Sequence, residues 1–63
     1  MKEEFKNLYN EVFDNNGKVK NCGREKCKKL ILICEQMDPN TIYGNKNTGF
    51  MDIDKILNLY KNL

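Results

Sequence analysis

The chain has 63 residues and a net charge of +2, a length that fits a single domain spanning residues 1–63. Its 40% hydrophobic and 32% charged residues are typical of a globular protein and argue against a disordered chain. No hydrophobic run approaches the roughly 20 residues that cross a bilayer, and the first residues lack the order of a signal peptide, so we expect no membrane contact.

A first helix is predicted over Lys2–Phe13. Its hydrophobic residues recur at the spacing of one helical face, which consists of Phe5, Leu8, Tyr9, Val12 and Phe13. Glu3 and Glu4 lie in the first turn, where the helix dipole favours negative charge. The stretch Asp14–Gly17 is expected to end the helix, because Asn and Gly accept the left-handed conformation.

A second helix is predicted over Arg24–Met37. It contains the only unbroken hydrophobic run of the chain, Leu30–Cys34, and a segment that is hydrophobic on more than one side needs packing partners on more than one side. A buried strand is the alternative, but the segment is too long for an ordinary strand. We expect Asn21 or Cys22 to open the helix, with Asn as the better N-cap, and Pro39 to enforce its end.

The segment 40–51 combines two opposite signals. It is rich in the turn formers Asn, Gly and Thr, yet it also holds four large hydrophobic residues that a polar loop does not need: Ile42, Tyr43, Phe50 and Met51. We expect either a minimal β-hairpin around Gly44–Gly49 or an ordered loop attached to the core by its apolar ends. These four residues are also the candidate partner-binding residues, because aromatic anchors dominate many protein interfaces.

A third helix is predicted to begin after Asp52, which acts as its cap, while Met51 packs on Ile56 as a hydrophobic staple. Its apolar face consists of Ile53, Ile56, Leu57, Tyr60 and Leu63. The expected fold class is therefore all-α, a small three-helix domain with an ordered loop or minimal β-hairpin before the last helix. Its core should hold Leu30, Ile31 and Cys34 between the outer helices, near Phe5, Val12, Ile56 and Tyr60.

Two stretches resemble parts of a degenerate EF-hand. Residues Phe13–Val19 follow the first helix like the entry to an EF-hand loop, and Asn47–Ile56 run into the third helix like the exit from another. The calcium pattern itself is not kept: the first loop is two residues short, and a glycine and a lysine stand where the family has its closing Glu. The resemblance implies a helix–loop–helix without calcium ligands, whose loops pair through Val19 and Met51.

The three cysteines, Cys22, Cys27 and Cys34, are expected to stay reduced and to bind no metal. On one helix, Cys27 and Cys34 would lie roughly 10 Å apart, beyond the Cα separation of about 7 Å that a disulfide allows. Structural zinc needs four ligands, and the chain has no histidine. We therefore expect no metal and no cofactor. Cys27 and Cys34 are interpreted as core residues, and Cys22, close to Lys20 and Arg24, is a candidate reactive thiol.

Reduced thiols are typical of an intracellular protein, so we expect a location in the cytoplasm, the nucleus or a virion interior. Asn and Lys are abundant, while Ala and Trp are absent. This usage is typical of an AT-rich genome, such as many viruses, phages and low-GC bacteria have.

The strongest charge asymmetry lies in residues 18–29. Six basic residues there oppose only Glu25 and give the stretch a net charge of +5, whereas the rest of the chain carries −3. The candidate phosphate contacts are Lys18, Lys20, Arg24, Lys26, Lys28 and Lys29. A basic loop that leads into a helix N-terminus suits contact with nucleic-acid phosphates. The simpler alternative is a solvated lysine face.

Enzymatic activity is not expected, because the chain has no His, no Ser and no Gly-rich phosphate loop. Asp52 and Asp54 are interpreted as a helix cap and a first-turn charge. We predict a non-enzymatic protein-interaction module or structural component that acts through a protein partner. The alternative is a nucleic-acid-binding accessory protein that uses the basic stretch. A second copy is also a candidate partner, because a symmetric dimer would complete a thin core.

Overall fold

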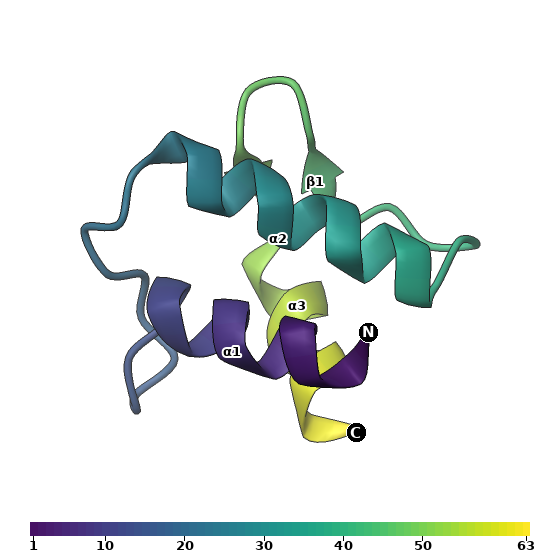
Figure 1. The fold of residues 1–63 in the computed structure, drawn as a ribbon, viewed down its shortest axis with the longest axis horizontal. Helices are drawn as coiled ribbons and strands as arrows, with labels where there is room; N and C mark the ends of the chain where they lie inside the picture. The colour runs from purple at the N-terminus through teal and green to yellow at the C-terminus, as the bar shows by residue number, and fades with distance from the viewer.

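The computed structural model describes residues 1–63 as three α-helices with a small antiparallel hairpin before the last helix (Figure 1). The elements in chain order are α1 (Lys2–Val12), α2 (Arg24–Met37), β1 (Gly44–Asn45), β2 (Phe50–Met51) and α3 (Ile53–Lys61). The expected fold class is therefore confirmed, and the hairpin, rather than a plain loop, is the form that segment 40–51 takes. In Figure 1, α1 and α2 run side by side in opposite directions, and the hairpin lies against α2.

The core forms where α2 meets the outer helices. Leu30, Ile31 and Cys34 are each 0% exposed, as are Phe5, Val12 and Ile56 on the other two helices, so their predicted burial is confirmed. Ile31 lies outside the cluster that Leu30 and Cys34 form with these helices and approaches Gly44 of the hairpin instead, so its predicted place between the outer helices is wrong. Tyr60 is half-buried and packs against this cluster. Its ring stacks on that of Tyr9, with centroids 3.9 Å apart and planes 5° from parallel. This pair joins α3 to α1, and stacked aromatic pairs stabilise packing beyond the area they bury.

The connection after α1 forms a turn whose two ends pair with each other. Phe13 has extended dihedral angles, φ −113° and ψ 146°, so α1 ends one residue earlier than expected, and Phe13 pairs with Val19 in an isolated antiparallel bridge. Asp14 holds the turn between them because its Oδ1 accepts hydrogen bonds from the backbone N–H groups of Asn16 (2.8 Å) and Lys18 (3.0 Å). Met51 pairs with Gly44. The expected pairing of Val19 with Met51 is therefore wrong, because Val19 pairs with Phe13 within its own turn.

The start of α2 also differs from expectation. Gly23 is the N-cap, with φ 86° and ψ 160°, and no side chain caps the helix, so neither Asn21 nor Cys22 opens it. A positive φ of this size favours glycine over any residue with a Cβ. At the other end of the chain, α3 stops at Lys61, so Leu63 lies beyond the helix and is 38% exposed.

The hairpin is fixed by its turn and by its contact with α2. Asn45 Oδ1 accepts hydrogen bonds from the N–H groups of Asn47 (2.8 Å) and Thr48 (3.2 Å), an arrangement that asparagine favours in turns. Gly44 has φ 146°, and a Cβ there would collide with the carbonyl oxygen of Phe50 and crowd Ile31 of α2. The close approach of β1 to β2 therefore requires glycine at this position.

Two leucines of α2 test the packing. Leu30 is 0% exposed and Leu32 is 43% exposed on the same helix, so Leu30→Ala leaves a cavity whereas Leu32→Ala does not. We expect Leu30→Ala to lower the free energy of unfolding by about 2–5 kcal/mol and Leu32→Ala to change it by less than about 1 kcal/mol. Urea denaturation followed by circular dichroism measures both. Equal effects of the two substitutions would contradict the burial of Leu30.

Candidate protein-interaction site

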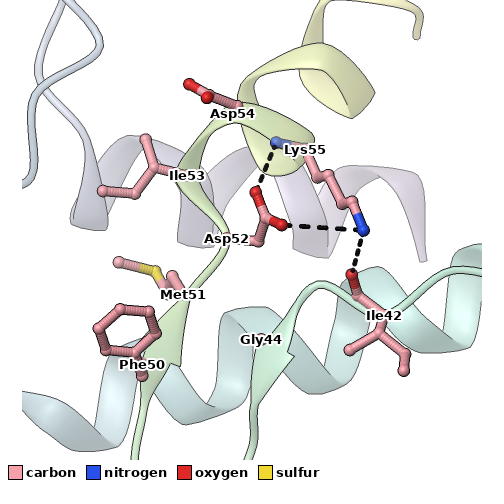
Figure 2. A pocket seen from close by; sticks show the side chains of 8 residues that line it. All are labelled: Ile42, Gly44, Phe50, Met51, Asp52, Ile53, Asp54 and Lys55. Carbon is pink, nitrogen blue, oxygen red and sulfur yellow. Dashed lines mark hydrogen bonds and ion pairs between the residues drawn. The ribbon is translucent and has the colours of Figure 1, made fainter.

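A groove of about 590 Å³ lies where the hairpin passes into α3 (Figure 2). The residues that line it are Ile42, Gly44, Phe50, Met51, Asp52, Ile53, Asp54 and Lys55. They come from the two strands, the segment before β1 and the first turn of α3. Three of the four candidate partner-binding residues, Ile42, Phe50 and Met51, are therefore brought together in one place.

The groove exposes large hydrophobic side chains. Ile42 is 72% exposed and Phe50 is 77% exposed, the two highest values among the large hydrophobic residues of the chain, and Ile53 is 39% exposed. Figure 2 shows Phe50, Met51 and Ile53 on one side of the groove and Ile42 on the other. Along β2 successive side chains point to opposite faces, so Phe50 faces solvent while Met51 packs against the core cluster.

A polar clasp separates the two hydrophobic sides. Asp52 caps α3 as expected: its Oδ1 accepts a hydrogen bond from the backbone N–H of Lys55 at 3.3 Å. Lys55 Nζ then reaches Asp52 Oδ2 at 3.8 Å and donates a hydrogen bond to the carbonyl oxygen of Ile42 at 3.4 Å (Figure 2). This contact ties the segment before β1 to the start of α3. Asp54, the other carboxylate of the groove, is exposed and forms no ion pair.

Tyr43 is the fourth candidate partner-binding residue, and its assignment was wrong. Its side chain is 4% exposed and belongs to the core. The phenol O–H donates a hydrogen bond to Asp38 Oδ2 at 2.9 Å, and burial followed by the nearby Asp38 carboxylate raises the pKa of Tyr43 to about 12. Tyr43 therefore attaches the segment before β1 to the end of α2, and it is not available to a partner.

Ile53 was assigned to the apolar face of the third helix and was missed as a groove residue. It is the first residue of α3, directly after the Asp52 cap. A side chain at this position lies beside the incoming strand rather than against another helix. A hydrophobic residue immediately after a cap, preceded by two more in Phe50 and Met51, is the signal that could have indicated this surface.

Four of the six basic residues of the stretch are exposed, Lys26 and Lys28 are half-buried, and three of the six side chains already have a partner. Lys26 Nζ forms an ion pair with Glu11 at 2.8 Å, and Lys28 Nζ forms one with Glu25 at 3.4 Å. The side chain of Lys20 donates a hydrogen bond to the carbonyl oxygen of Asn10 at 2.7 Å. The remaining three side chains are exposed and make no ion pair: Lys18, Arg24 and Lys29.

The three cysteines differ in their environment. Cys34 is fully buried, and burial together with the neighbouring Glu35 raises the pKa of its thiol to about 12. Cys22 and Cys27 are half-buried, and all three thiols are free in this structure. The structure contains no cluster of three or more His, Cys, Asp or Glu side chains suited to hold a metal ion.

No known family model, curated protein or solved structure matches this chain. None of its three helices combines the length and the hydrophobicity needed to span a membrane. The side chains of the groove and their surroundings are therefore the features that bear on function.

The attachment of Tyr43 predicts an acid-dependent stability. Hydrogen bonds from Thr41 and then from Tyr43 hold the pKa of Asp38 below its usual 3.8. The pKa of Asp38 is lower in the folded protein than in the unfolded chain, where it is near 3.8. The stabilisation is therefore complete above pH 3.8 and is lost as the pH falls through the pKa of the folded state. We expect Asp38→Asn to weaken the fall of the melting temperature with acid. Asp54→Asn is the control for the loss of one negative charge, because Asp54 makes no ion pair. An equal change in the two variants would contradict the role assigned to Asp38.

Proposed function

We propose that this chain is a small non-enzymatic protein-interaction module that binds a protein partner through the groove between the hairpin and α3. The observation that carries the proposal is the exposure of Ile42 and Phe50, at 72% and 77%, on either side of one groove. Single exposed hydrophobic residues are ordinary on protein surfaces, but a group of them around a hollow is typical of a binding site. Large aromatic side chains are also the residues that most often carry interface affinity.

The charges of the groove define the chemistry of the partner. Asp52 and Lys55 neutralise each other within the clasp, so Asp54 is the carboxylate left for an external cation. The partner that fits is a protein segment with one or two hydrophobic side chains for the groove and a Lys or Arg beside them for Asp54. The rim pair formed with Asp54 would add orientation more than affinity, because exposed ion pairs contribute little.

The groove is also firmly supported, which favours binding without a large ordering cost. The cap of Asp52, the clasp of Lys55 and the turn closed by Asn45 hold the backbone on both sides of Phe50. A side chain presented on a fixed backbone loses less freedom when a partner binds. This rigidity supports a preformed interface rather than a loop that folds on contact.

Substitution of the exposed anchors tests the proposal. Phe50→Ala and Ile42→Ala should each weaken binding by about tenfold or more, while the melting temperature stays near that of the wild type because both side chains are exposed. Leu32→Ala is the matched control, since Leu32 is an exposed hydrophobic residue that does not line the groove. Quantitative capture from the native host identifies the partner, and calorimetric titration with that purified partner measures the affinities.

Retention of full affinity by Phe50→Ala, or an equal loss in Leu32→Ala, would contradict the assignment of the groove. A second copy of the chain is one of the partners that this experiment can reveal. Sedimentation of the wild type and of Phe50→Ala over a range of concentrations would then show a dimer that the substitution dissociates. A monomer at all concentrations assigns the groove to a different protein.

Nucleic-acid binding through the basic stretch is the second candidate function, and the three unpaired side chains Lys18, Arg24 and Lys29 favour it. Phosphate contacts release counterions, so such binding must fall steeply with salt. We expect only weak retention on immobilised duplex DNA, and we expect the triple variant Lys18→Glu, Arg24→Glu, Lys29→Glu to keep its protein partner. Tight, salt-sensitive retention of the wild type that the triple variant loses would favour the nucleic-acid function instead.

A further inference from the structure

Two cysteines lie together at the start of α2. Gly23 is the N-cap, so Cys22 directly precedes the cap and Cys27 is the fourth residue of the helix. Side chains at these two positions meet across the first turn of a helix, in the arrangement known as a hydrophobic staple. Both cysteines are half-buried and both pack against the same core cluster.

Their positions on either side of the first turn bring the two thiols within reach of each other's charge. Burial raises the pKa of the Cys27 thiol, and the charge of Cys22 and a hydrogen bond with it raise the pKa further. Cys22 Sγ also lies 3.8 Å from the carbonyl oxygen of Gly23, which places it over the cap of the helix. Cys34, in contrast, is 0% exposed two turns further along α2. The chain therefore carries one adjacent pair of partly accessible thiols and one isolated thiol.

We propose that Cys22 and Cys27 form an oxidation site, where hydrogen peroxide links the two sulfur atoms into a reversible intramolecular disulfide. The bond would replace the contact between the two thiols by a covalent one. It would tie the basic loop to the first turn of a helix whose cap makes no side-chain hydrogen bond. The proposal does not depend on the groove or on its partner.

With hydrogen peroxide the reaction has two steps. The Cys22 thiolate attacks one peroxide oxygen, the O–O bond breaks, and hydroxide leaves and is protonated to water, which gives a sulfenic acid at Cys22. The Cys27 thiolate then attacks Cys22 Sγ, the S–O bond breaks, and a second hydroxide leaves and becomes water. The two sulfur atoms lose two electrons, which reduce the peroxide, and the protein loses two hydrogen atoms.

The sequence makes the product easy to read. Trypsin cleaves after every Lys and Arg of this region, so the three cysteines fall on three different peptides, which are Asn21–Arg24, Cys27–Lys28 and Leu30–Lys46. The folded protein is treated with one equivalent of hydrogen peroxide. It is then unfolded, alkylated with iodoacetamide, digested and analysed by mass spectrometry. Non-reducing electrophoresis separates a monomeric product from cross-linked chains.

The expected product is a monomer in which the first two peptides are joined and only Cys34 carries the alkyl group. Dithiothreitol should restore three alkylated thiols. The oxidised protein should melt at a higher temperature than the reduced protein, since the link fixes the start of α2. Cys22→Ser and Cys27→Ser should each abolish both the joined peptides and the oxidant-dependent shift, and circular dichroism confirms that each variant folds.

Three results would overturn the proposal. The first is a disulfide between two chains in place of the joined peptides, and the second is a link that includes Cys34. The third is oxidation of Cys22 to sulfinic acid while Cys27 remains free to alkylate, which would show that the two sulfur atoms do not meet. The joined peptides are measured on the wild type, so the outcome does not depend on whether either variant folds.

Discussion

The fold depends on one helix, α2, that is hydrophobic on more than one side. Leu30 and Cys34 belong to the cluster that packs with α1 and α3, whereas Ile31 points to the hairpin, where the space beside Gly44 allows no additional atom. A helix of this kind is stable only when both sides are covered. The hairpin therefore covers the side of α2 that the other two helices leave open. The groove with its exposed Phe50 lies on the outer side of the hairpin, so the position of the groove follows from the packing of α2.

In both α2 and α3 an apolar residue precedes the N-cap, but only α3 has a side chain that caps its first turn. In α3, Met51 packs against the core cluster that includes Ile56, and the carboxylate of Asp52 accepts a backbone hydrogen bond, so the start of the helix is both covered and capped. In α2, two cysteines occupy the corresponding positions, and Gly23 offers no side chain to the free N–H groups. An uncapped first turn is the end of a helix that opens most readily. A link between the two sulfur atoms would act at the less supported of the two starts.

Much of this arrangement follows from the sequence, and the failures have physical causes. The helices could be predicted because hydrophobic residues spaced like Phe5, Tyr9 and Val12 fall on one face only when the segment is helical. Tyr43 was misplaced because a short segment rich in turn formers has no period that tells an inward side chain from an outward one; the hydrogen bond to Asp38 decides it. Gly23, and not Asn21, is the N-cap of α2, and its backbone has a positive φ. The spacing of hydrophobic residues in the sequence carries no information on such a dihedral angle.

The contacts of Tyr60 with Tyr9 and Phe5 bring the start of α1 close to the end of α3. Phe5, in the first turns of α1, lies with its ring centroid 6.2 Å from that of Tyr60, in the last turn of α3, and Figure 1 shows both ends on the same side of the molecule. A short peptide could therefore join Leu63 to Met1, and the chain could be opened at the exposed Asn15 and Asn16, which interrupts the turn held by Asp14 but no helix. The same side-chain contacts would then form in a different order along the chain. Such a circular permutant would separate the contribution of loop closure to the folding rate from that of the core itself.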